Sequence, residues 1–133
     1  MLAEEEGVKF TPYTDSVGKL TIGIGHNLTD NGISQAICDA MFQEDIYEVM
    51  DDLDKELPWW QNLDDVRARV FADLCFNMGI ETLCQFHKMI SASVSQDWSV
   101  AAIELRTSQW YKDVGPTRGN KLVNMLLTGQ DAV

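Results

Sequence analysis

The functional groups best suited to chemistry lie near the N-terminal end of the chain: the carboxylates of Glu6 and Asp15, the hydroxyl of Thr21 and the imidazole of His26. Hydrolysis of a glycoside needs two carboxylates on opposite walls of a cleft. One of them is protonated to donate a proton, and the other is ionised to activate water or to attack. Because the chain holds 21 acidic residues, such a pair alone says little, and the surrounding segment has to carry the interpretation.

That surrounding segment is predicted to form a β-hairpin. Residues 8–11 and 20–22 are rich in β-branched and apolar side chains, which is typical of short strands. A turn-prone loop that contains Asp15 separates them. Pro12 has no N–H to donate, so we expect it on an edge or at a bulge. Gly7 can end a short N-terminal helix, which would place Glu6 at the end of that helix.

Two glycines after the second predicted strand raise the alternative of a dinucleotide-binding loop. Gly23 and Gly25 flank Ile24, a spacing that also occurs in Gly-x-Gly-x-x-Gly motifs. The third glycine is missing here, and no βαβ unit follows. We therefore reject this alternative.

The motifs Glu6-Gly7, Tyr-x-Asp15-x-x-Gly and Thr21-Ile-Gly-x-Gly-His26 occur in this order. Together they resemble the signature of the bacteriophage T4-type lysozymes, the endolysins of glycoside hydrolase family 24. The resemblance implies that Glu6 is the general acid, that Asp15 positions or activates the attacking water, and that Thr21 assists. It also implies cleavage of the β-1,4 bond between N-acetylmuramic acid and N-acetylglucosamine in peptidoglycan, without a cofactor or a metal.

Further motifs extend the resemblance to about residue 129. Phe76-Asn77-Met-Gly is similar to a motif at the floor of the family's cleft, which implies that Phe76 and Asn77 contact substrate. An equal alternative is a structural role, with Phe76 in the core and Asn77 near the end of a helix. Ser-x-Trp-Tyr followed by Arg118 is similar to the family's C-terminal signature, and it implies that Arg118 reaches back to the catalytic Glu6.

Two residues that follow the glycine pair are also assigned to the substrate site. His26 and Leu28 are expected at the cleft edge by the same resemblance. For His26 we predict a structural ion pair with Asp45 in preference to a catalytic role.

The remaining chain is predicted to be helical. Ser34 is the expected N-cap of a helix from Gln35 to Glu56, with an apolar stripe at Phe42, Ile46, Val49, Met50 and Leu53. Pro58 stops it, and Trp59 and Trp60 are expected to pack at the junction. Further helices are predicted after a cap at Asn62 up to Gly79, over 98–106 after a cap at Asp97, and from Pro116 to about Leu127 before Gly129.

The expected fold class is α+β and lysozyme-like, in a single domain over residues 1–133. A small β-hairpin lobe (about 7–33), a linking helix (about 34–57) and a larger helical lobe (about 58–133) are expected to flank a cleft. The segment after His26 is short, whereas some family members carry a longer insertion there, so the β lobe should be small.

Composition limits the partners and the compartment. The net charge of −11 argues against nucleic acid, and no apolar run approaches the ~20 residues that span a bilayer. The resemblance implies peptidoglycan glycan strands as the partner, and a monomeric state is expected. No secretory signal is visible, which predicts synthesis in a host cytoplasm and action in the periplasm or cell wall. The cysteines, Cys38, Cys75 and Cys84, are expected to be buried free thiols.

Two features motivate an alternative to a working enzyme. The acidic charge disfavours approach to an anionic wall, and the six residues up to Glu6 are fewer than family members usually have there. The alternative is a catalytically weak or inactive lysozyme-fold protein that binds peptidoglycan. A third alternative is a protein-interaction module, and only the acidic charge supports it.

Overall fold

The computed structural model describes residues 7–132, which divide into two compact units. The first unit ends at Gln43, and the second begins at Glu44. The predicted N-terminal helix and Glu6 lie outside the described residues.

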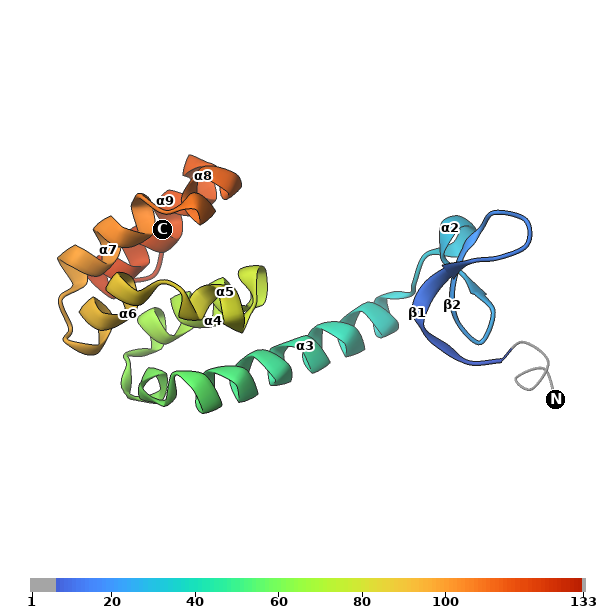
Figure 1. The fold of residues 1–133 in the computed structure, drawn as a ribbon, viewed down its shortest axis with the longest axis horizontal. Coiled ribbons are helices and arrows are strands. Elements are labelled where there is room, and N and C mark those ends of the chain that lie inside the picture. The colour runs from blue at the N-terminus through green and yellow to red at the C-terminus, as the bar shows by residue number, and fades with distance from the viewer. Residues whose placement is uncertain (1–6, 133) are drawn as a thin grey trace. The chain divides into compact units, whose positions relative to one another are not determined.

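The first unit is built on a three-stranded antiparallel sheet. Its strands are β1 (Lys9–Thr14), β2 (Leu20–Gly23) and β3 (His26–Asn27), in the order β1-β2-β3 (Figure 1). The predicted hairpin is confirmed as β1 and β2, with Tyr13 opposite Thr21. Pro12 lies on the edge strand within an irregular stretch of the pairing, where its missing N–H costs no ladder hydrogen bond.

A tight turn joins β2 to β3 and requires its two glycines. Gly23 and Gly25 have φ values of 69° and 67°, a region that residues with a Cβ rarely adopt. The third strand was not predicted, because its two residues are too few to show a pattern. The short helix α2 (Leu28–Asn31) follows, capped by the side chain of Asn27.

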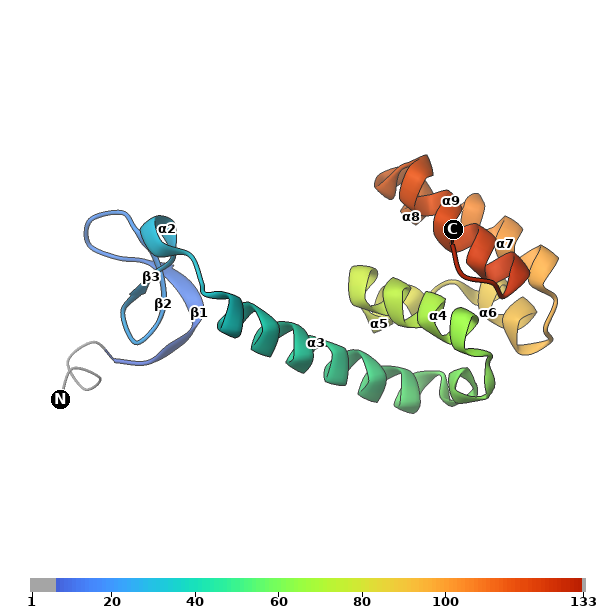
Figure 2. The same cartoon turned by 180° about the vertical axis from the view of Figure 1, so that it is seen from behind.

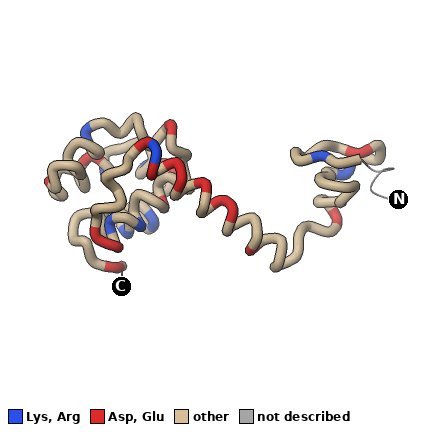
Figure 3. The backbone as a smooth tube through the Cα atoms, turned by 90° about the horizontal axis from the view of Figure 1, so that it is seen from below, with Lys and Arg blue, Asp and Glu red and all other residues tan. Residues whose placement is uncertain are grey.

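The long helix α3 (Gln35–Glu56) has the predicted bounds. The Ser34 hydroxyl accepts a hydrogen bond from the Ile37 N–H at 3.2 Å, which confirms the predicted N-cap. Acidic residues recur along the helix (Figure 3), and they are Asp39, Glu44, Asp45, Glu48, Asp51, Asp52, Asp54 and Glu56.

The predicted apolar stripe of α3 is only partly buried. Val49 and Leu53 belong to the core of the second unit, whereas Phe42 and Met50 are 55% and 43% exposed. The prediction is wrong for the last two, because the core of the helical unit covers only one narrow side of the last turns of α3.

The second unit is helical and encloses the main hydrophobic core. Helix α9 contacts α4, α7 and α8, and α7 also contacts α6 (Figure 2). The largest fully buried side chains are those of Leu53, Phe71, Leu74, Leu83, Met89, Leu105 and Leu126. The elements after α3 are η1 (Pro58–Asn62), α4 (Asp65–Met78), α5 (Ile80–Cys84), α6 (His87–Val94), α7 (Trp98–Arg106), α8 (Gln109–Val114) and α9 (Pro116–Thr128).

Most helix ends follow local signals. Asp97 caps α7, Pro116 is the first residue of α9, and Gly129 ends α9 in the left-handed conformation, all as predicted. The cap predicted at Asn62 is wrong, since Asn62 closes the 3-10 turn and Asp64 caps α4 instead. Asp64 has the extended backbone that an N-cap needs.

The tryptophans after Pro58 pack at the junction, as predicted. The Trp59 ring meets the Phe71 ring edge-on, with centroids 5.1 Å apart, and the Trp60 Nε1–H donates to Asp54 at 2.8 Å.

The cysteines differ from the prediction at one position. Cys75 is buried and Cys84 is half-buried, but Cys38 is exposed, because the first turns of α3 lie outside the core.

Candidate active site

The hairpin turn between β1 and β2 fixes the carboxylate of Asp15. Oδ1 accepts hydrogen bonds from the Val17 N–H at 3.0 Å and from the Lys19 N–H at 2.8 Å. The Asp15 N–H in turn donates to the Lys19 carbonyl at 2.8 Å, which closes the loop. Among residues 7–132, Oδ2 has no hydrogen-bond partner. A half-buried carboxylate with one oxygen held and the other open can hold a water molecule.

Thr21 lies directly beside this turn on β2. Its side chain is only 3% exposed, and its hydroxyl donates to the Lys19 carbonyl at 3.0 Å. Thr21 therefore does not face solvent, although it is a polar residue on a short strand. The hydroxyl proton of Thr21 is engaged, but the oxygen keeps its lone pairs, so it can still accept a hydrogen bond from a water or a substrate. The third predicted catalytic residue, Glu6, lies outside the described residues.

His26 and Leu28 flank Asn27, and Asn27 pairs with Thr21 between β3 and β2. The His26 Nε2–H donates to the Gly32 carbonyl, so the ring is held within its own turn. The pairing of His26 with Asp45 stays a prediction, because the two residues belong to different units. Leu28 is half-buried at the start of α2, and its contact with substrate also stays a prediction.

In the helical unit, Phe76 and Asn77 occupy the last turn of α4. Phe76 is 44% exposed. The Asn77 Oδ1 accepts a hydrogen bond from the Trp110 Nε1–H at 2.9 Å, which ties α4 to α8. The amide oxygen of Asn77 thus has a structural role, and its NH₂ group keeps both of its donors without a partner in the described chain.

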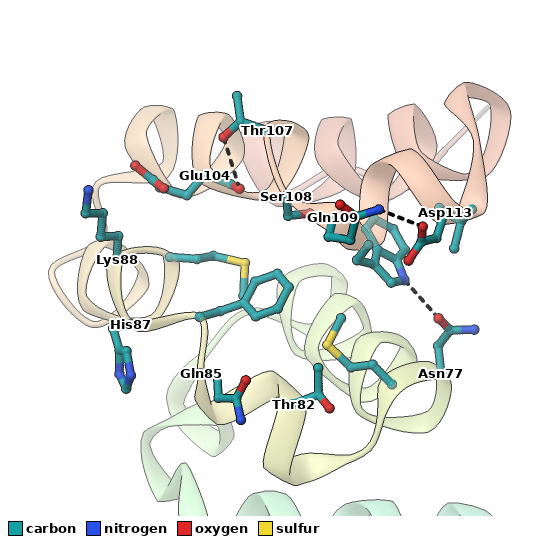
Figure 4. Close-up of a pocket in the computed structure, with 15 residues that line it drawn as sticks. Asn77, Thr82, Gln85, His87, Lys88, Glu104, Thr107, Ser108, Gln109 and Asp113 are labelled. Carbon is teal, nitrogen blue, oxygen red and sulfur yellow. Dashed lines mark hydrogen bonds between the residues drawn. The ribbon is translucent and has the colours of Figure 1, made fainter.

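Asn77 also lines a pocket of about 720 Å³ within the helical unit (Figure 4). Its apolar lining comes from Met78, Phe86, Met89, Trp110 and Val114, and its polar lining comes from Asn77, Thr82, Gln85, His87, Lys88, Glu104, Thr107, Ser108, Gln109 and Asp113. A concave pocket that combines apolar side chains with polar groups is the kind of cavity that binds small ligands.

Most of this pocket was missed by the sequence reasoning. Trp110 belongs to the Ser-x-Trp-Tyr motif, which was a usable signal, but Gln85, Glu104 and Asp113 stand in no motif. The Gln109 amide donates to Asp113 at 2.8 Å, so this part of the polar lining is already ordered.

Arg118 is held by a partner that was not predicted. Its Nη2 donates to Asp73 Oδ1 at 2.8 Å, and both side chains are about half exposed. The predicted contact with Glu6 involves a residue outside the described part of the chain. Within the range 7–132, no three His, Cys, Asp or Glu side chains are grouped as ligands for a metal ion.

The small antiparallel sheet and the helical unit, with Asp15 and Thr21 on the hairpin, define an α+β fold of the lysozyme-like class. The chain belongs to the phage lysozyme family, whose model matches residues 3–127. Membership makes it a lysozyme-type glycoside hydrolase, from a family that acts on peptidoglycan.

Similar proteins come from an amoeba and a phage. Two probable T4-type lysozymes of Dictyostelium discoideum are 27% and 24% identical, over 97% of this chain and 92% of each relative. The pre-baseplate central spike protein Gp5 of Enterobacteria phage T4 is 26% identical over 97% of this chain but only 27% of its own length. The alignments to the two amoebal proteins run over 158 residues, longer than this chain of 133, so those relatives carry insertions relative to it.

Between residues 7 and 132, no helix is both long enough and apolar enough to cross a membrane.

Proposed function

We propose that this protein is a muramidase that hydrolyses the β-1,4 bond between N-acetylmuramic acid and N-acetylglucosamine in peptidoglycan. Asp15 is the general base, Thr21 helps to hold the attacking water, and Glu6 is the general acid. No cofactor takes part, and the anomeric carbon is inverted because the water, not a carboxylate, attacks it.

The observation that carries this proposal is the arrangement of Asp15 and Thr21 around the Lys19 backbone. The N–H groups of Val17 and Lys19 hold Asp15 Oδ1, while the Lys19 carbonyl accepts the Thr21 hydroxyl proton. Asp15 Oδ2 in the turn and the Thr21 oxygen on β2 are therefore the two acceptors that we assign to the attacking water. A water bound by two acceptors has both protons engaged, so its lone pair is free to attack.

The pocket of the helical unit supports a substrate with sugar and peptide parts. Its apolar floor can pack against a sugar face or a methyl group, and its amides and hydroxyls can bond to N-acetyl or peptide groups. Asn77 lines this pocket, and we assign it to substrate binding together with its neighbour Phe76. His26 and Leu28 are assigned as further contacts, and Arg118 as a cation that orients the acid.

The test is hydrolysis of purified peptidoglycan, with the reducing-end sugars identified by mass spectrometry. Wild type should release muramic-acid reducing ends. Asp15→Asn and Glu6→Gln should each lower the rate by about 10²- to 10⁴-fold, since each removes one side of the acid–base pair. The exposed Asp131, on the helical unit, provides a control, and Asp131→Asn should retain the wild-type rate.

The stereochemistry is tested separately. The first product formed from a soluble glycan should be the α-anomer when read by NMR before mutarotation. A β-anomer would replace the water mechanism by one with a covalent intermediate. Folded wild type that binds the wall but releases no sugar would favour the catalytically inactive binding protein.

A further inference from the structure

The short helix α2 contacts the first residues of β2, next to the two hairpin residues of the proposed site. The Thr29 hydroxyl oxygen of α2 accepts a hydrogen bond from the Leu20 N–H at 2.7 Å. Leu20 is the residue between Lys19 and Thr21. A side chain outside the hairpin therefore holds the hairpin backbone at this point.

The peptide groups of Lys19 are the common support of Asp15 and Thr21. The Lys19 N–H donates to Asp15 Oδ1 at 2.8 Å, and the Lys19 carbonyl accepts from the Asp15 N–H at 2.8 Å and from the Thr21 hydroxyl at 3.0 Å. The Leu20 N–H that Thr29 binds belongs to the same peptide group as this carbonyl. A displacement of that one peptide plane would move the supports of both side chains.

A second contact joins the same two segments. The Lys19 ammonium lies 3.2 Å from Asp30 Oδ1, and Asn27 donates to the other oxygen of Asp30 at 2.9 Å. Asn27 Oδ1 in turn accepts from the Asp30 N–H at 3.0 Å, so Asp30 is fixed on the capped end of α2. The side chains of Lys19 and Asp30 are 39% and 50% exposed, and such an ion pair is weak and screened by salt.

We propose that Thr29 is a positioning residue for the muramidase site. Its hydroxyl fixes the peptide between Lys19 and Leu20, and through that peptide it sets the positions of the Asp15 carboxylate and the Thr21 hydroxyl. The Lys19–Asp30 ion pair is a second and weaker support of the same backbone. This inference rests on the proposed function, because it assigns a purpose to the placement of Asp15 and Thr21.

The experiment compares Thr29→Val, which keeps the shape and removes the hydroxyl, with Thr29→Ser, which keeps the hydroxyl. Thr29→Val should lower kcat on a soluble peptidoglycan fragment about tenfold with KM unchanged, because a small misplacement of a base affects the chemical step. Thr29→Ser should restore most of the lost kcat. Thr11→Val is the matched control, since Thr11 is an exposed β1 residue whose hydroxyl has no hydrogen bond to any described residue.

A spectroscopic measurement gives a readout that does not depend on turnover. The amide proton shifts of Val17 and Lys19 report their hydrogen bonds to Asp15, and they should move in Thr29→Val but not in Thr11→Val. If Thr29→Val does not fold, Asp30→Asn serves as the second variant. It should lower kcat by a smaller factor at low salt and leave kcat unchanged at high salt.

The outcomes separate this inference from the proposed function. Wild-type kcat and unchanged Val17 and Lys19 shifts in a folded Thr29→Val protein would overturn the role of Thr29. An equal loss in Thr29→Val and Thr29→Ser would overturn it as well. If wild type itself releases no muramic-acid ends, the proposed function fails instead.

Discussion

The three cysteines of this chain stand in three different environments. Cys38 is exposed near the start of α3, Cys84 is half-buried, and Cys75 is buried in α4. Burial is the main cause that raises the pKa of the Cys75 thiol to about 11, and the negative charges of Asp52 and Glu48 add to it, as does Cys84. A thiol with so high a pKa carries little thiolate at neutral pH, so Cys75 is a packing residue.

The raised pKa of Cys75 predicts a loss of stability in alkali. The unfolded thiol ionises near pH 9.0 and the folded thiol near pH 11, so the unfolded chain binds fewer protons in this window. The free energy of unfolding should therefore be unaffected by Cys75 below pH 9 and fall as the pH rises from 9 through 11, by up to about 3 kcal/mol.

Urea unfolding at pH 8 and pH 10.5, with a reductant present, checks this prediction. Because other groups also titrate there, the quantity to compare is the loss in wild type minus the loss in Cys75→Ala. Cys38→Ala is the control and should follow wild type, since its thiol is exposed. The same loss in wild type and Cys75→Ala would contradict the prediction.

At the scale of elements, Arg67 of α4 holds the C-terminal end of α9. Its Nε donates to the Leu126 carbonyl at 2.7 Å, and its Nη2 donates to the Leu127 carbonyl at 2.8 Å. The guanidinium also lies 4.2 Å from the centre of the Trp98 ring on α7. The last carbonyls of a helix lack partners within the helix, so one side chain completes α9 and joins it to two other helices.

We predict that Arg67→Lys destabilises the protein by about 1–3 kcal/mol. An ammonium cannot make both carbonyl bonds and the flat stacking on Trp98 at once. Urea unfolding gives the measurement. Arg69→Lys on the same helix is the control. Among residues 7–132, the exposed Arg69 pairs only with Asp131, at 2.7 Å, and its loss should cost less than about 1 kcal/mol. An equal loss of unfolding free energy at the two positions would show that the hydrogen bonds to the α9 carbonyls do not stabilise the protein.

The whole molecule carries a net charge of −11, and α3 holds many of the acidic residues (Figure 3). A charge of this size acts over the Debye length, which shrinks from about 30 Å in 0.01 M salt to about 10 Å in 0.1 M salt. An anionic wall should therefore repel the enzyme most strongly in dilute buffer.

The resulting prediction is that lysis of intact walls speeds up severalfold between about 0.01 M and 0.1 M salt, as repulsion is screened. The measurement is the clearing rate of a wall suspension as a function of salt. An uncharged soluble glycan is the control substrate, and its hydrolysis should show no such rise. A wall-clearing rate that only falls with salt would show that the net charge does not limit access.

The features that could be predicted from the sequence alone depend on residues that are neighbours along the chain. Ser34, Asp97 and Gly129 mark helix ends through groups within their own turn, and the hairpin brings Asp15 to Thr21 through the Lys19 peptide groups. Local hydrogen bonds and backbone preferences need no knowledge of the rest of the fold. The family motif of the hairpin could therefore be recognised, and the bounds of α3, α7 and α9 were predicted correctly.

Only the tertiary structure decided which side chains meet across long stretches of chain. The bonds of Trp110 to Asn77, of Arg118 to Asp73 and of Arg67 to Leu126 span 33, 45 and 59 residues. The pocket of the helical unit draws its lining from α4 through α8 in the same way. Such contacts depend on how the helices pack around the common core. That packing results from many apolar contacts together, so no single stretch of the sequence predicts it.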